Sequence, residues 1–172
     1  MAENALEKPI ADHAMATCLW FDGKAEDAAK LYCGLFPDSA LGDVQQAPGD
    51  YPGGSKGDVL TVEFTVLGKP FLALNGGPEA GFTDAVSFQV FTDTQDETDR
   101  YWEALLEGGG EAMMCSWLKD RFGVRWQIVP RVLMEGLRHP DPAARERVFA
   151  AMGAMKRIDH AAIEAAIAGD AQ

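Results

Sequence analysis

The chain has 172 residues, 47% of them hydrophobic and 24% charged, so it can bury a substantial core without a disulfide or metal. Its 27 acidic residues outnumber the 15 basic ones and give a net charge of -12. Such an acidic surface repels nucleic-acid backbones and anionic membranes, so we expect neither as a partner.

The sequence also indicates the cellular compartment in which the protein is located. No apolar run approaches the roughly 20 residues that span a bilayer, and the N-terminus shows no secretory signal. Three cysteines without CxxC spacing favour free thiols in a reducing environment. We therefore expect a cytoplasmic protein.

After a polar tail over residues 1–13, the first half predicts one strand, one helix and three further strands over 14–80. The expected elements are a strand over 15–21, a helix over 24–36, a weak strand over 41–47, and a hairpin formed by 58–67 and 70–74. The segment Asn75-Gly76-Gly77-Pro78 then breaks the pattern.

The second half, 81–130, repeats this order. We expect a strand over 85–91, a helix over 96–107 that ends at three glycines, and short strands over 112–117 and 124–129 around a turn at Phe122-Gly123. Shifting the first half by 70 residues places Phe21 on Phe91 and Tyr32 on Trp102. The sequence therefore predicts an α+β fold made of two related modules.

Residues 131–172 form a helical extension of different composition. Asp141-Pro142 is typical of a helix N-terminus, and the helix that follows should run to about Met155. Its expected buried residues are Val148, Phe149, Met152 and Met155. A second helix should start near Asp159, with Ile163 and Ile167 turned inward.

Several segments resemble a known family over about residues 14–168. They are Leu19-Trp20-Phe21-Asp22-Gly23-Lys24-Ala25-Glu26, Ala73 to Pro78, Val86-Ser87-Phe88, Asp99-Arg100-Tyr101-Trp102, and the long run from Trp117 to Pro130. They resemble the PhnB-like branch of the glyoxalase/bleomycin-resistance/dioxygenase superfamily, whose members often carry the name 3-demethylubiquinone-9 3-methyltransferase. The resemblance implies paired βαβββ modules that form a cupped mixed sheet, and a homodimer.

The resemblance also locates the positions where metal enzymes of the superfamily hold a divalent ion with His and Glu. Counting from the helix aromatics gives Thr17 and Ser87, and counting from Gly123 gives Gln127; the fourth position falls near Leu72 or Ala73. None of these is a histidine or a carboxylate, the ligands that suit such ions. We therefore expect no metal and no cofactor.

We instead expect the cup to hold a small molecule of unknown identity. The candidate ligand-binding residues are Thr17, Asn75, Ser87, Gln89, Trp117 and Gln127, because pockets combine apolar walls with a few polar groups. A cationic cluster of Lys119, Arg121 and Arg125 could attract an anion such as a phosphonate, although we expect it to be a solvated hairpin.

Other functions stay open. One is a metal-dependent lyase, isomerase or dioxygenase-like enzyme that uses His13, Glu63 or Cys115. Another is the methyltransferase that the family label names. The sequence argues against it, because no glycine-rich turn leads from a strand into a helix. A third is a structural dimer without a ligand.

Overall fold

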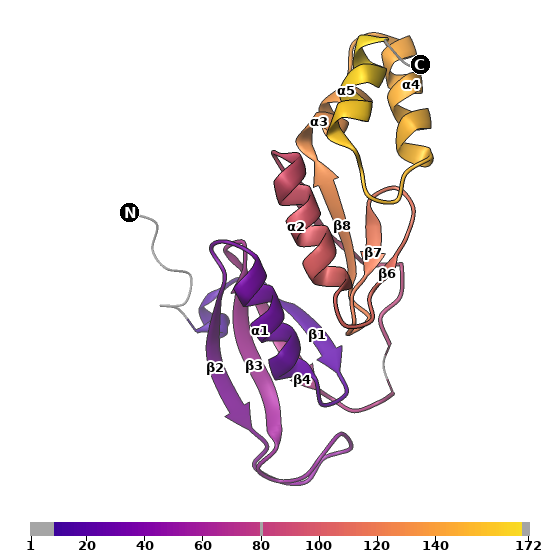
Figure 1. Cartoon of the computed structure of the whole chain (residues 1–172). Coiled ribbons are helices and arrows are strands. Elements are labelled where there is room, and N and C mark those ends of the chain that lie inside the picture. Colours follow the sequence, from indigo (N-terminus) through magenta and orange to yellow (C-terminus); the bar gives the residue numbers. More distant parts are fainter. Residues whose placement is uncertain (1–8, 80, 170–172) are drawn as a thin grey trace. The chain divides into compact units, whose positions relative to one another are not determined.

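The computed structural model describes residues 9–79 and 81–169. The chain divides into two compact units, and the boundary along the sequence lies between Gly81 and Phe82. Each unit holds one four-stranded mixed sheet covered by a helix (Figure 1). The predicted α+β fold of two βαβββ modules is confirmed. Most of the predicted tail lies outside the described residues, and its end forms a short 3-10 helix, η2 (Ile10–Asp12).

The first unit follows the chain order β1 (Thr17–Phe21), α1 (Ala25–Leu35), β2 (Ala40–Gln46), β3 (Val59–Val66) and β4 (Lys69–Asn75). Its sheet has the order β1-β4-β3-β2, with β1 parallel to β4 and the other pairs antiparallel. The helix intervenes between β1 and the remaining strands, as a parallel connection requires.

Alternation along the strands decides which face α1 covers. Leu19 and Phe21 of β1 are buried, as are Val62, Phe64 and Val66 of β3 and Phe71 and Ala73 of β4. The helix presents Ala25, Ala28, Ala29 and Tyr32 to them, at helical spacing. The Phe64 and Phe71 rings stack at 5.2 Å between centroids. This face is therefore the core of the first unit.

The second unit repeats the pattern with β5 (Phe88–Thr92), α2 (Gln95–Leu106), β6 (Glu111–Ala112), β7 (Trp117–Lys119) and β8 (Arg125–Pro130). Its sheet has the order β5-β8-β7-β6, with β5 parallel to β8. Leu118, Trp126 and Ile128 are fully buried, and Tyr101, Trp102 and Leu105 of α2 are buried as well. Trp102 therefore belongs to the core of the second unit.

Asp120 organises the hairpin between β7 and β8. Its Oδ1 accepts hydrogen bonds from the backbone N–H groups of Phe122 (2.9 Å) and Val124 (3.0 Å), and its Oδ2 accepts one from the indole Nε1 of Trp126 (2.9 Å). The carboxylate is only 1% exposed, so these donors take the place of water. The acidic residue in this long motif is thus a structural one.

The C-terminal extension contains α3 (Arg131–Leu137), α4 (Pro142–Gly153) and α5 (His160–Ala168). These helices build a core of their own from Leu133, Val148, Ile158, Ile163 and Ala166, which Val129 of β8 joins. Asp141 and Asp159 cap α4 and α5 by accepting bonds from Ala143 N and Ala162 N. The extension therefore packs onto the end of the second sheet.

Several local expectations were wrong. The strand expected over 112–117 is interrupted, because Cys115 and Ser116 both have positive φ and the strand begins only at Trp117. Helix α3 was not foreseen. Phe149 is 65% exposed, because α4 turns Val148 rather than its neighbour to the core. Trp20 is 38% exposed and lies on the face of its strand opposite α1.

Candidate functional site

The face of the second sheet opposite α2 brings together four of the six candidate residues. Gln89 of β5 is the register partner of Gln127 of β8, and Trp117 of β7 is the register partner of Gln127 on the other side. Residues paired in this way share a face, so the three side chains form a row across the sheet. Ser87, just before β5, joins them. We call these four residues the polar row.

Hydrogen bonds order the polar row. Gln89 Nε2 donates to Gln127 Oε1 at 3.0 Å, and Gln127 Nε2 donates to Ser87 Oγ at 2.7 Å. This leaves the Oε1 of Gln89 as an acceptor and the hydroxyl hydrogen of Ser87 as a donor, while each amide keeps a second N–H. Trp117, half-buried beside Gln127, adds a flat apolar surface. The row therefore presents hydrogen-bond donors and acceptors beside an apolar ring.

The charged residues on the same face are neutralised by partners. Lys119 Nζ lies 2.5 Å from Glu111 Oε2, and Arg125 Nε lies 2.6 Å from Asp84 Oδ1. The hydrogen bond and charge of Lys119 lower the pKa of Glu111, so this carboxylate stays ionised in the pair. The cationic cluster considered from sequence is thus paired at Lys119 and Arg125. Its third member, Arg121, lies over the ring of Phe122, 4.9 Å from its centroid.

Thr17 and Asn75 belong to the first unit. Thr17 shares the face of Leu19 and Phe21, which α1 covers, while Cys18 and Trp20 lie on the opposite face. Counting residues across a turn cannot fix register to one position, and a shift of one residue moves a side chain to the other face. Cys18 and Trp20 were not identified from the sequence as the residues on the uncovered face of β1. The alternation of apolar Leu19 and Phe21 could have indicated it, because the residues between buried positions lie on the opposite face.

Asn75 joins three segments of the first unit. Its Oδ1 accepts a hydrogen bond from Ala25 N at the start of α1 (2.9 Å), and its Nδ2 donates to Val59 O (2.9 Å). The residue is 6% exposed and lines a pocket of about 260 Å3 with Gly23, Glu26, Asp27, Tyr51, Gly53, Asp58 and Val59. Its amide is already committed to the fold, so a ligand would meet mainly its neighbours.

The glycines after Asn75 contact the side chain of Trp20. The indole Nε1 of Trp20 donates to Gly77 O at 2.8 Å, and a Cβ on Gly76 would collide with the Trp20 ring. Only glycine lets the loop approach the ring so closely. The two motifs of the first unit therefore contact each other, and both have structural reasons for their residue types.

The residues at the superfamily's metal positions do not fit a divalent ion. Ser87 and Gln127 are neutral and bonded to each other, and Thr17 lies on the face under α1. Across residues 9–79 and 81–169, His, Cys, Asp and Glu side chains form no group of three that could hold a metal. Glu63, one of the alternative ligands considered from sequence, accepts a hydrogen bond from Ile10 N at 3.0 Å.

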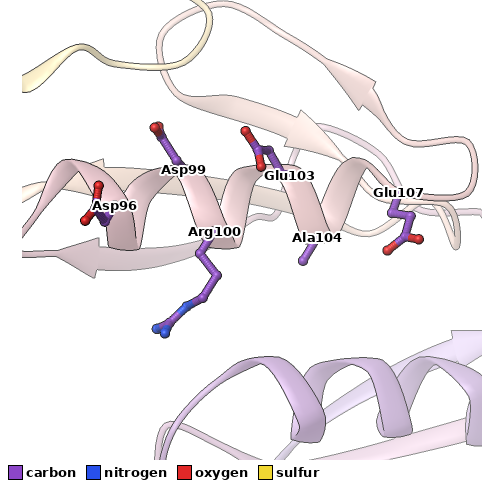
Figure 2. A pocket seen from close by; sticks show the side chains of 6 residues that line it. All are labelled: Asp96, Asp99, Arg100, Glu103, Ala104 and Glu107. Carbon is purple, nitrogen blue, oxygen red and sulfur yellow. The ribbon is translucent and has the colours of Figure 1, made fainter.

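A further pocket lies on the outer surface of α2. Figure 2 shows Asp99 and Glu103 on one side of the helix and Arg100 and Ala104 on the opposite side, with Asp96 and Glu107 towards its two ends. Two of the carboxylates have a cationic partner: Arg157 lies 3.3 Å from Asp99 and 3.2 Å from Glu103. We interpret this surface as a solvated helix face, since acidic side chains there need no ligand.

The comparisons with known proteins agree with this architecture. A family model described as 3-demethylubiquinone-9 3-methyltransferase matches residues 13–129, more than half of the chain. The chain belongs to this family. The family is the PhnB-like branch of the glyoxalase superfamily to which the sequence motifs pointed. No curated protein matches the chain significantly.

Two solved structures share the fold over about two thirds of this chain. The PhnB protein of Bacillus cereus is 29% identical, with a TM-score of 0.60, and the match covers 69% of this chain and 99% of that one. For protein PA1353 of Pseudomonas aeruginosa the identity is 22%, the TM-score 0.54, and the coverage 69% and 98%. The family match ends at residue 129, so α3, α4 and α5 lie outside it.

Proposed function

We propose that this protein binds an uncharged, planar small molecule on the polar row, and that it does so without a metal or cofactor. The observation that carries this proposal is the hydrogen-bonded order Gln89–Gln127–Ser87 beside Trp117. Its unused donors and acceptors alternate, which complements a carboxamide, a phenol or a similar group. The paired charges around it favour a neutral ligand over an anion such as a phosphonate.

Three probes of nearly identical shape test the proposal: neutral benzamide, anionic benzoate and cationic benzamidine. Each is titrated into nitrogen-15-labelled protein while the side-chain amide signals of Gln89 and Gln127 and the indole signal of Trp117 are followed. We expect benzamide to shift these signals at the lowest concentration. Gln127→Leu, which keeps the approximate volume but removes the amide, should abolish the shifts.

The outcomes separate the parts of the proposal. If none of the three probes moves the signals of the polar row, small-molecule binding on this face is wrong. If benzoate binds more tightly than benzamide, the site exists but its preference for an uncharged ligand is wrong. Glu164→Gln on the exposed side of α5 is the control, because it removes a charge far along the chain from the row.

We further propose a cytoplasmic homodimer. Cys18, Cys33 and Cys115 are free thiols, which favours a reducing compartment. Every helix in the described part of the chain is too short or too polar to cross a membrane. Trp20 and Phe91, on sheet faces opposite the helices, are 38% and 39% exposed, which favours a partner surface. Sedimentation equilibrium should give about twice the chain mass of 18.6 kDa; a monomer would contradict the proposal.

The family name supports one alternative, a methyltransferase. The glycines after β4 lead into a loop and then β5, rather than into a helix that could hold a nucleotide phosphate or ribose. Calorimetry with S-adenosylmethionine tests it, and measurable binding would favour the alternative. A metal-dependent enzyme that uses His13, Glu63 or Cys115 is tested by elemental analysis of protein purified without chelator.

A further inference from the structure

The segment between α4 and α5 lies against the start of β7. Cys115 N donates to Met155 O at 2.8 Å, and Ser116 N donates to Lys156 O at 2.9 Å. Two successive N–H groups thus bind two successive carbonyls of the extension. On the other side, Ser116 O accepts a hydrogen bond from Ile128 N of β8 at 3.0 Å. The pair Cys115-Ser116 therefore lies between the sheet and the extension and is bonded to both.

This pair has an uncommon backbone conformation. Cys115 has φ 57° and Ser116 has φ 68°, the left-handed region that residues with a Cβ rarely adopt. Such residues keep this conformation only when the surrounding structure holds them there. The N–H groups of both residues donate to carbonyls of the same segment, and these hydrogen bonds help to hold the pair in this conformation. The carbonyls of Met155 and Lys156 are the partners that meet this requirement.

The next residue is Trp117 of the polar row. Its register with Gln127 begins directly after the left-handed pair, so the conformation of the pair sets where the indole lies on the sheet. The loop that holds the pair is itself anchored. Ile158 is 1% exposed in the core of the extension, its carbonyl accepts from Gln95 Nε2 at 3.3 Å, and Arg157 bonds with Asp99 of α2.

We propose that the loop over residues 154–159 is the positioning element for Trp117, with Ile158 as its anchor. The C-terminal extension is then part of the binding site, although the family match ends before it. The role of Trp117 as a ligand contact rests on the proposed function; the coupling between the loop and Trp117 does not.

The test follows Trp117 without any ligand. In nitrogen-15 spectra of the full chain, the indole signal of Trp117 is assigned with Trp117→Phe. Ile158→Ala should shift or broaden that signal and should speed hydrogen exchange at the Cys115 and Ser116 amides by about tenfold or more. Ile158→Val, which keeps most of the side chain, should change both by less than Ile158→Ala does. Should Ile158→Ala fail to fold, Ile158→Val is compared directly with the parent and should show a smaller change of the same kind.

The matched control is Leu105→Ala, which removes a fully buried side chain from α2 in the same unit. It should destabilise the unit without selectively moving the Trp117 signal or the two amides. Equal effects of Ile158→Ala and Leu105→Ala would overturn the proposal, as would an unchanged Trp117 signal in both Ile158 variants.

Benzamide then separates this proposal from the previous one. If the parent binds benzamide, Ile158→Val should weaken the binding by about threefold or more, because a less fixed indole loses preorganisation. If the parent does not bind benzamide, the proposed function is wrong, and the indole signal and amide exchange still decide the positioning role.

Discussion

A single buried carboxylate illustrates how much one residue contributes to the second unit. Asp120 receives three hydrogen bonds within the hairpin. In Asp120→Asn the amide nitrogen would face a donor, either the Trp126 indole or a backbone N–H. Because a buried unsatisfied donor is costly, we expect a loss of about 1–3 kcal/mol in the free energy of unfolding, measured with urea. Asp43→Asn, which removes the same charge from an exposed strand position, is the control and should change little.

Cys33 allows a prediction about pH. Burial raises the pKa of its thiol from 9.0 to about 11, and its Sγ lies 3.7 Å from Thr65 O. Because the folded pKa lies above the unfolded one, the neutral thiol contributes stability below about pH 9, and this contribution is lost as pH rises toward 11. The parent should therefore lose more stability over this range than Cys33→Ala, in urea titrations at matched pH values. Parallel curves for the two proteins would contradict the burial effect.

At the scale of elements, α4 shows what sequence patterns can and cannot decide. Val148 and Phe149 are adjacent and both apolar, and the sequence predicted that both are buried. The structure buries Val148 in the core of the extension and leaves Phe149 65% exposed. Two adjacent apolar residues in the middle of a helix fit either orientation, and the positions of α3 and α5 select one.

The same two residues give a matched test. Val148→Ala should lower the free energy of unfolding by about 1–3 kcal/mol, because it leaves a cavity beside Ile163 and Gly136. Phe149→Ala should change it by less than about 0.5 kcal/mol. Chemical unfolding of both variants decides the matter. A large loss in Phe149→Ala alone would mean that another chain covers this ring.

The sheets were more predictable than their details. Ser87 and Gln127 were expected from the family resemblance, by counting from Trp102 and Gly123, and in the structure they share one face with Gln89. Thr17 came from the same kind of count, from Tyr32, and lies on the face that α1 covers, because a shift of one residue along a strand reverses the face. The left-handed pair Cys115-Ser116 carried no signal, since neither residue type is typical of that conformation, and distant carbonyls hold it.

At the scale of the whole molecule, the family match ends at residue 129, and this raises the question of whether the second unit needs the C-terminal extension. A chain ending at residue 130 would contain the whole segment that the family model matches, residues 13–129, yet the extension contributes to the second unit. Val129 packs in its core. The Oγ1 of buried Thr98 lies 2.6 Å from Thr92 Oγ1 and 2.9 Å from His160 Nε2. Removal of residues 131–172 would expose apolar side chains, and Thr98 would keep Thr92 but lose His160. The N–H groups of Cys115 and Ser116 would lose the carbonyls of Met155 and Lys156.

We therefore expect a chain that stops after Pro130 to be insoluble, or to unfold at a clearly lower urea concentration than the full chain. Buried groups that lose their partners cost about 1–3 kcal/mol each, a large part of the stability of a small domain. The control keeps the full length and replaces exposed Ala150 of α4 with Ser, which should leave the transition unchanged. A truncated chain as stable as the full one would show that the extension packs on the second sheet without supporting it, as an accessory rather than a part of its core.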